Sequence, residues 1–132
     1  MMKIHHIGYL VQNIEKAQAQ FKELGFTEST QLFSDELRGI YIIFMEKDGY
    51  VIELISPSKD NSIVSNLIKT HKNSPYHICY ESFNIDDDMK SLKRNKYIKI
   101  TDLEPAIAFD NKKVVFFLHP YLGMIEVVDA VG

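Results

Sequence analysis

The pattern of hydrophobic and polar positions divides the chain into strands and helices that occur twice in the same order. Apolar and alternating runs predict strands over residues 4–11 and 76–83, and apolar residues at helical spacing follow each strand. Asn13 and Asn84 are suited to cap these helices, because an asparagine side chain accepts hydrogen bonds from the free N–H groups of a first turn. Gly25 is typical of the left-handed residue that ends a helix.

Several β-rich runs follow each expected helix. The two longer runs of each half are residues 39–46 and 49–56, and residues 113–119 and 123–129. They predict hairpins that turn at Lys47-Asp48-Gly49 and near Pro120–Gly123. A short strand is expected before each hairpin, near residues 27–33 and 98–103. Each half of the chain therefore predicts a β-α-β-β-β order.

The two halves also match residue by residue. Residues 77–97 repeat residues 6–26 at an offset of 71, and residues 117–129 repeat residues 44–56 at an offset of 73. Self-similarity over this much of the chain is a signal of the whole fold and outweighs local propensity. The polar residues that recur are His6 and His77, near the start of a strand, and Glu53 and Glu126, in the last strand of each half.

We therefore expect an α+β fold built from two tandem βαβββ modules within a single domain, residues 1–132. The first module spans about residues 3–57 and the second about residues 75–130, with a connector over about residues 58–74. Within the connector we expect a short helix over residues 62–69 that carries Ile63, Leu67 and Ile68.

Composition limits the partners. The chain has 132 residues, of which 45% are hydrophobic and 25% charged, and its net charge is −3. This balance disfavours nucleic acid or an anionic membrane as the main partner, and the pairs Lys93-Arg94 and Lys112-Lys113 are expected at the surface. One cysteine, Cys79, cannot form an intrachain disulfide, and no apolar run is long enough to span a membrane. We expect a cytoplasmic protein with a small-molecule partner.

Glu53 and Glu126 both lie inside apolar runs. Strand side chains alternate between faces, so each carboxylate shares a face with apolar neighbours. A buried carboxylate is costly unless a cation, a hydrogen-bond donor or a metal pairs with it. The recurring histidines and glutamates could simply record a duplicated fold. If the modules pack about a pseudo-twofold axis, however, two nitrogen and two oxygen ligands converge, which suits Ni, Co, Zn, Fe or Mn.

The other histidines and the cysteine fit this metal site less well. Adjacent strand residues point to opposite faces, so only one of His5 and His6 can reach it, and the repeat selects His6. His71 lies in the polar connector and His119 precedes a proline turn. Cys79 shares a face with His77, and we expect it to be a small residue of the cleft wall rather than a nucleophile.

The stretches "HHIGYLV", "DGYVIELISP", "PYHICYE" and "GMIEVVD" resemble the vicinal oxygen chelate superfamily over essentially the whole chain. This superfamily includes glyoxalase I, methylmalonyl-CoA epimerase, extradiol dioxygenases and the bleomycin- and fosfomycin-resistance proteins. The resemblance implies that the two modules form a curled mixed sheet around a metal-containing cleft. It also implies one divalent metal ion, with no other cofactor-binding residue. By position, the family's metal ligands fall on His6, Glu53, His77 and Glu126.

The same resemblance implies a function. A set of four ligands favours the isomerase branch, of the methylmalonyl-CoA epimerase or lactoylglutathione lyase type. Such enzymes abstract a proton alpha to the carbonyl of a thioester or hemithioacetal. The resemblance implies Glu126 as the first candidate for the base and Glu53 as the second. The alternatives are a small-molecule-binding protein of the same fold and a metal-dependent oxygenase.

The resemblance also bears on a further glutamate and on the oligomeric state. Epimerases of this family tend to carry a further, non-ligand glutamate ahead of the third strand, and Asp35, Glu36 and Leu37 occupy that neighbourhood here, with Leu37 at the aligned position. The family resemblance also implies a homodimer as the possible oligomeric state.

Overall fold

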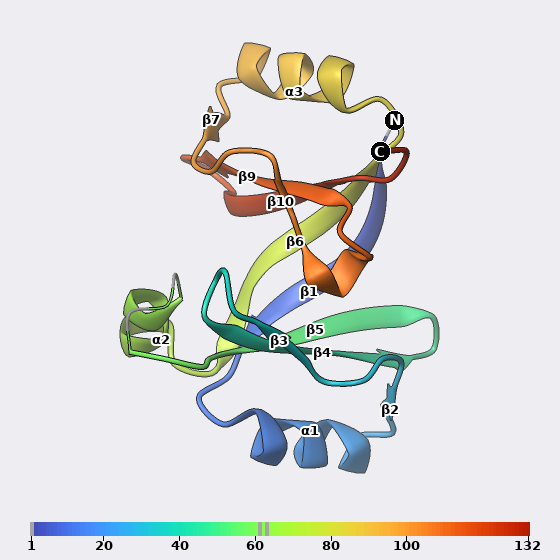
Figure 1. Ribbon diagram of the computed structural model, residues 1–132, viewed down its shortest axis with the longest axis vertical. Helices are drawn as coiled ribbons and strands as arrows, with labels where there is room; N and C mark the ends of the chain where they lie inside the picture. The colour runs from blue at the N-terminus through green and yellow to red at the C-terminus, as the bar shows by residue number, and fades with distance from the viewer. Residues whose placement is uncertain (1, 61, 63) are drawn as a thin grey trace. The chain divides into compact units, whose positions relative to one another are not determined.

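The structure is a computed structural model that describes residues 2–60, 62 and 64–132. It has an α+β fold whose strands form both parallel and antiparallel pairs (Figure 1). The helices are α1 (Ile14–Glu23), α2 (Ser65–His71), α3 (Ile85–Arg94) and the 3-10 helix η1 (Ile107–Phe109). The strands are β1 (Lys3–Leu10), β2 (Thr27–Glu28), β3 (Phe33–Asp35), β4 (Ile40–Lys47), β5 (Tyr50–Pro57), β6 (Ser74–Ser82), β7 (Ile98–Lys99), β8 (Glu104–Pro105), β9 (Lys113–His119) and β10 (Gly123–Asp129).

The chain divides into two compact units. The N-unit is His6–Tyr76, and the C-unit combines the N-terminal residues through His5 with His77–Gly132. Strand β1 passes from the C-unit to the N-unit immediately before His6, and β6 passes from the N-unit to the C-unit immediately before His77.

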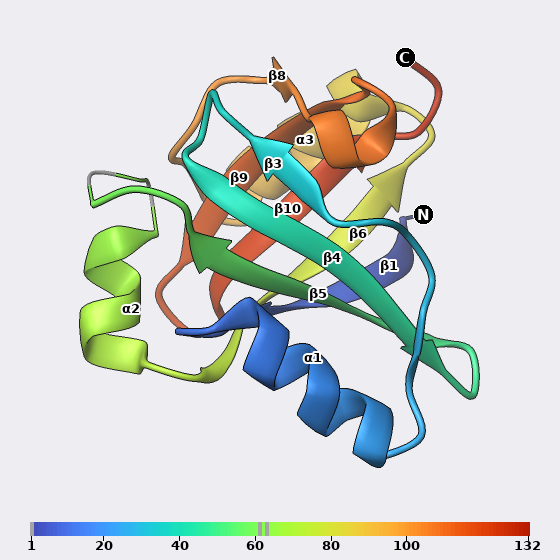
Figure 2. The same cartoon turned by 60° about the horizontal axis from the view of Figure 1, so that its bottom comes forward.

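In the N-unit the strands follow the order β2-β4-β5-β1, with β3 paired to β4. Strand β1 runs parallel to β5, while the β4–β5 pair is antiparallel. Helix α1 covers one face of this sheet (Figure 2). We call this the helix face and its opposite the histidine face. The core between α1 and the sheet comprises Val11, Ile14, Ile43, Met45 and Leu54, with Tyr9, Ala17, Phe21, Phe26 and Ile52 packed against them.

The C-unit repeats this arrangement. Its strands follow the order β7-β9-β10-β6, with β8 paired to β9 and with β10 parallel to β6. Helix α3 covers its helix face (Figure 1). The core there comprises Leu92, Val115, Phe117, Ile125 and Val127, with Met2, Tyr80, Ile85, Met89, Tyr97 and Leu103 packed against them.

The local signals in the sequence explain where these elements begin and end. The Asn13 side chain accepts a hydrogen bond from the Lys16 amide at 3.0 Å, and Asn84 accepts one from the Asp87 amide at 3.3 Å, so both predicted caps are confirmed. Gly25 follows α1 with φ +98°, the left-handed conformation that favours glycine. The predicted turn after Lys47 is also confirmed.

Three expected elements differ in extent. The single strand expected near residues 27–33 is two short strands, β2 and β3, and the second copy is likewise split into β7 and β8. The connector helix α2 is Ser65–His71 rather than residues 62–69. Ile63, which we expected in that helix, lies outside the described residues. Turn-forming and short polar stretches set these boundaries, and apolar periodicity alone does not locate them.

Within the described residues, every helix falls short of the length and apolar character that a membrane crossing requires.

Candidate metal centre

The N-unit brings two of the predicted residues together on its histidine face. Tyr9 of β1 and Val11, which follows that strand, point to the α1 core, so alternation turns His6 to the other face. Along β5, Ile52 and Leu54 point to α1 and Glu53 does not. His6 is 1% exposed and Glu53 is 3% exposed. His6 Nε2 lies 3.1 Å from Glu53 Oε1.

The C-unit holds a matching pair on its own histidine face. Ile125 and Val127 of β10 face α3, so Glu126 points away from that helix. His77 is 4% exposed and Glu126 is 5% exposed. His77 Nε2 lies 3.1 Å from Glu126 Oε1, the separation found in the N-unit.

An aromatic ring packs beside each pair, and the sequence analysis did not identify these rings. Phe44 lies opposite Glu53 in the sheet register, and its ring contacts the His6 ring at 5.3 Å between centroids. Phe116 lies opposite Glu126 and contacts the His77 ring at 5.4 Å. Both contacts are edge-on, so each imidazole is held against a ring while its Nε2 faces the carboxylate. The recurring phenylalanines of the hairpins are the signal that could have located them.

The donor chemistry fits a divalent metal. Two ligands at right angles on one ion, each about 2.1 Å from it, lie about 3.0 Å apart. The 3.1 Å between imidazole nitrogen and carboxylate oxygen in each unit matches this separation. Each pair can also stand as a buried histidine–carboxylate contact, which relieves the cost of burying the carboxylate. The four buried side chains that offer ligand atoms are His6, Glu53, His77 and Glu126.

The remaining histidines have other surroundings. The His5 ring packs edge-on against Phe109 at 5.1 Å. His71 is exposed at the end of α2, where its Nδ1 lies 3.1 Å from the Thr70 hydroxyl. His119 Nδ1 accepts a hydrogen bond from the Tyr121 amide at 3.1 Å.

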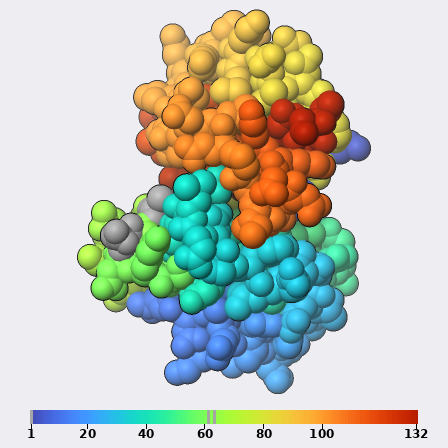
Figure 3. Space-filling view, viewed as in Figure 1, coloured from blue at the N-terminus to red at the C-terminus, as the bar shows by residue number. Residues whose placement is uncertain are grey.

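Cys79 is fully buried on the histidine face of the C-unit, opposite Glu126 in the register of β6 and β10. Ala106, Val114, Val128 and Phe109 surround it. The segment around η1 therefore packs over this part of the sheet, and Figure 3 shows that segment in orange at the surface. The Cys79 side chain thus lies in an apolar wall of the C-unit.

In the segment from Asp35 to Leu37, one acidic side chain is buried and hydrogen-bonded within a turn. Asp35 is 4% exposed, and its carboxylate accepts hydrogen bonds from the Arg38 guanidinium at 2.9 Å and the Arg38 amide at 3.0 Å. Glu36 is exposed and accepts from the Ser34 hydroxyl. Leu37 is 71% exposed. The buried acid of this segment thus holds the turn between β3 and β4.

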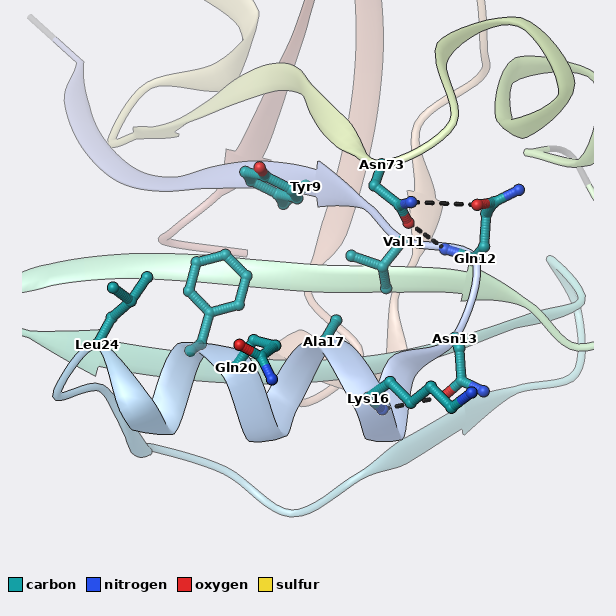
Figure 4. Close-up of a pocket in the computed structure, with 10 residues that line it drawn as sticks. Tyr9, Val11, Gln12, Asn13, Lys16, Ala17, Gln20, Leu24 and Asn73 are labelled. Carbon is teal, nitrogen blue, oxygen red and sulfur yellow. Dashed lines mark hydrogen bonds between the residues drawn. The ribbon is translucent and has the colours of Figure 1, made fainter.

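A recess of about 520 Å³ lies on the opposite, helix face of the N-unit. It opens between α1 and the end of β1, and Figure 4 shows the Asn73 side chain bonded to Gln12 at its rim. Tyr9, Ala17 and Phe21 form its apolar wall. None of the four candidate ligands lines it.

Comparison with curated proteins finds relatives that are named as methylmalonyl-CoA epimerases. The chain is 29% identical over 119 residues to the mitochondrial methylmalonyl-CoA epimerase of Bos taurus, covering 89% of this chain and 67% of that protein. It is 28% identical over 119 residues to an ethylmalonyl-CoA/methylmalonyl-CoA epimerase of Cereibacter sphaeroides, covering 89% and 88%. The chain thus spans about two thirds of the bovine protein's length.

Solved structures share the fold. A hypothetical protein from Bacillus halodurans C-125 superposes with a TM-score of 0.84 at 22% identity, covering 97% of this chain and 94% of that one. Methylmalonyl-CoA epimerase from Mycobacterium tuberculosis gives a TM-score of 0.79 at 17% identity, covering 96% and 86%. The family model described as Glyoxalase/Bleomycin resistance protein/Dioxygenase superfamily matches residues 5–116. The chain therefore belongs to the glyoxalase/bleomycin resistance protein/dioxygenase superfamily.

Proposed function

We propose that this protein is a metal-dependent isomerase that moves a proton alpha to the carbonyl of an acyl thioester, as a methylmalonyl-CoA epimerase does. The observation that carries the proposal is the pair of buried histidine–glutamate contacts, one in each unit, at 3.1 Å in both. Relatives named as methylmalonyl-CoA epimerases support the choice of a thioester over a hemithioacetal.

In this proposal His6, Glu53, His77 and Glu126 together hold one divalent ion. Such an ion acts as a Lewis acid that stabilises negative charge on the carbonyl oxygen when the alpha proton is lost. The imidazoles serve as neutral nitrogen donors, and Phe44 and Phe116 fix the orientation of their rings. The burial of all four side chains excludes water, which strengthens electrostatic interactions within the site.

Glu126 is the proposed base, and Glu53 is the second candidate for that role. Epimerisation removes a proton from one face of a carbon and delivers a proton to the other face. A carboxylate that holds the ion carries no proton, so the glutamate that takes up the alpha proton would have to release the ion as it does so. The two glutamates are the carboxylates that the duplicated modules supply in matched positions. Asp35 is not proposed for this role because its carboxylate is bonded to Arg38.

Deuterium exchange tests the chemistry. Protein is incubated in D₂O with methylmalonyl-CoA and, separately, with the hemithioacetal of methylglyoxal and glutathione, and bound metal is measured by elemental analysis. We expect about one divalent ion per chain and deuterium in methylmalonyl-CoA. Glu126→Gln should slow exchange at least about 100-fold, the scale of a lost general base. Glu15→Gln, an exposed glutamate of α1, is the matched control.

The alternatives give different results. Exchange into the hemithioacetal alone would replace the thioester with a glutathione adduct. Stoichiometric metal with exchange into neither substrate would contradict the isomerase and favour a binding protein, while oxygen consumption would favour an oxygenase. Absence of metal after reconstitution with Ni, Co, Zn, Mn or Fe would overturn the ligand assignment, as would full metal content in His6→Ala and His77→Ala.

A further inference from the structure

The recess on the helix face of the N-unit is a cavity that the proposed function does not use. Its volume of about 520 Å³ lies within the range of about 300–1,000 Å³ that is typical of small-molecule pockets. It opens on the face opposite to that of His6 and Glu53, and none of the four candidate metal ligands lines it. Its own lining residues therefore indicate what it would bind.

The recess is elongated along α1. The helix residues that line it recur at helical spacing and so lie on one stripe of α1; they are Asn13, Lys16, Ala17, Gln20, Phe21 and Leu24. At a rise of 1.5 Å per residue, Lys16 and Leu24 are about 12 Å apart along the helix axis. Figure 4 shows Asn13 and Lys16 at the first end of α1 and Leu24 at its last end. The recess therefore suits an extended ligand whose two ends differ.

The side of the recess that α1 forms is more apolar than the fold requires. Ala17 is half-buried, and Leu24 is 63% exposed although it is large and apolar. At an offset of 71, the C-unit has Asp88 in place of Ala17 and Asn95 in place of Leu24, and both of these side chains form hydrogen bonds within the C-unit. The same helix and sheet thus form with polar residues at both positions, so the apolar stripe of α1 is particular to the N-unit.

The charge at the first end of the recess is also particular to the N-unit. Among the described residues that line the recess, Lys16 is the one charged side chain. Its counterpart in the C-unit is Asp87, whose carboxylate accepts a hydrogen bond from the Asn84 side chain at 2.9 Å. The helix dipole favours an acid and disfavours a cation in the first turn. The stability of α1 therefore does not explain why this position holds a lysine.

Two hydrogen-bond donors at this end are not used within the protein. Asn13 caps α1 through its side-chain oxygen, which leaves the NH₂ group of the same side chain as a donor. Within residues 2–60, 62 and 64–132, neither this NH₂ group nor the Lys16 ammonium donates to a protein group, and both side chains are exposed. An anionic group at this end of the recess would accept hydrogen bonds from both.

We propose that the recess binds a carboxylate that carries an unbranched alkyl chain, with octanoate as the probe. The carboxylate lies at the Asn13–Lys16 end, and the chain lies along α1 beside Ala17 and Phe21, towards Leu24. This is a ligand site separate from the four buried histidine and glutamate side chains. The inference therefore does not depend on the proposed function.

The chemistry of the recess matches the two parts of such a ligand. Each methylene group that leaves water for apolar contact strengthens binding by up to about fourfold. An ammonium group attracts a carboxylate, and salt screens this attraction at an exposed site. A ligand with one negative charge at one end and an apolar chain thus complements a recess with one cation at one end and an apolar wall along its length.

Titration of isotope-labelled protein by NMR tests the proposal with three probes, each kept below the concentration at which it forms micelles. We expect octanoate to cause saturable shifts of backbone amides along α1 and at the end of β1. Hexanoate, which lacks two methylene groups, should bind about 5- to 15-fold more weakly. Lys16→Gln should weaken octanoate about 2- to 5-fold at low salt and less at high salt, and should leave the uncharged probe octan-1-ol unchanged.

Two further variants separate loss of binding from loss of folding. Ala17→Leu fills the recess and should weaken both octanoate and octan-1-ol at least about 10-fold. Lys16→Asp introduces the residue of the C-unit and should abolish octanoate binding, while the midpoint of thermal denaturation rises because the helix dipole favours the acid. The matched control is Lys90→Gln, an exposed lysine of α3, which should leave every Kd unchanged.

Several results would overturn the proposal. One is the absence of saturable shifts with octanoate, and another is binding that Ala17→Leu leaves at the wild-type Kd. Equal Kd values for octanoate in Lys16→Gln and the wild type at low salt would remove the carboxylate from the assignment. Dimerisation through the recess, seen as loss of the dimer in light scattering of Ala17→Leu with no octanoate binding to the wild type, would make it an interface between copies of the chain.

Discussion

The helix faces of the two units share one plan but are filled differently. In the C-unit, Ser82 is fully buried and its hydroxyl donates a hydrogen bond to the Asp88 carboxylate, which joins β6 to α3. At an offset of 71, the N-unit has Val11 and Ala17 in these positions. These two short apolar side chains form part of the wall of the recess beside α1.

A second position shows the same contrast. Met2 packs against the apolar core under α3 in the C-unit. Its counterpart in the N-unit is Asn73, whose amide side chain bonds to both the backbone and the side chain of Gln12. The C-unit thus has a thioether and a polar pair at positions where the N-unit has Asn73 and two short apolar side chains, beside a recess of about 520 Å³. Both units form the same sheet although the side chains between helix and sheet differ. The strands, rather than these side chains, therefore define the fold that the units share.

The largest predicted effect tests whether the apolar cores of the two units are equally well packed. Phe117 and Met45 occupy corresponding core positions, each with 0% exposure. We expect Phe117→Ala to lower the free energy of unfolding by about 3–5 kcal/mol and Met45→Ala by about 2–5 kcal/mol, because each leaves a cavity. Urea denaturation measures both. A loss under 1 kcal/mol in either variant would show that its core is loosely packed.

Filling the recess should have a smaller effect, and it should raise rather than lower the free energy of unfolding. Ala17→Leu should raise the free energy of unfolding by about 1 kcal/mol, because leucine is also a good helix former and buries apolar area there. The matched change, Asp88→Leu, should lower it by about 1–3 kcal/mol, since the buried Ser82 hydroxyl loses its acceptor. The midpoint of thermal denaturation should rise in Ala17→Leu and fall in Asp88→Leu. Shifts of the same sign and size would contradict the inferred difference between the two helix faces.

The smallest effect concerns the ion pair that the C-unit lacks. The hydrogen bond and charge of Lys22 hold the pKa of Glu28 below the ordinary glutamate value. A lowered pKa in the folded state adds stability above the unfolded-state pKa, and this is lost as the pH falls through the folded-state pKa. Because Glu28 is exposed, the change in unfolding free energy is small. NMR titration should show the Glu28 pKa rising in Lys22→Gln; an unchanged value would exclude the pair as its cause.

Much of the fold follows from local signals in the sequence. Asn13 and Asn84 cap α1 and α3 as predicted, because capping depends on the side chain and its next three residues. Strand alternation and the repeat single out His6, Glu53, His77 and Glu126, whereas the contact of each histidine with the glutamate of its own unit is seen only in the structure. The joint role of all four residues as ligands remains a prediction.

Other features depend on contacts that no local pattern encodes. The offset of 73 aligns Phe44 with Phe117, whereas the register places Phe44 and Phe116 opposite the glutamates. The second hairpin has three residues between His119 and Gly123, against two between Lys47 and Tyr50. One extra residue in a turn shifts the alignment of the preceding strand and reverses its faces. The recess likewise arises from side-chain volumes across β1 and α1.

The passage of β1 from one unit to the other has a consequence for synthesis on the ribosome. The N-unit is one continuous segment, His6–Tyr76, so all of its residues emerge before those of β10. The C-unit needs Met2, which precedes that segment, and the core under α3, which follows it. Domains tend to fold as they emerge from the ribosome. Met2 is synthesised early but can pack against the core under α3 only after that core has been synthesised. The two modules are similar in sequence, yet they differ in the order in which their parts emerge.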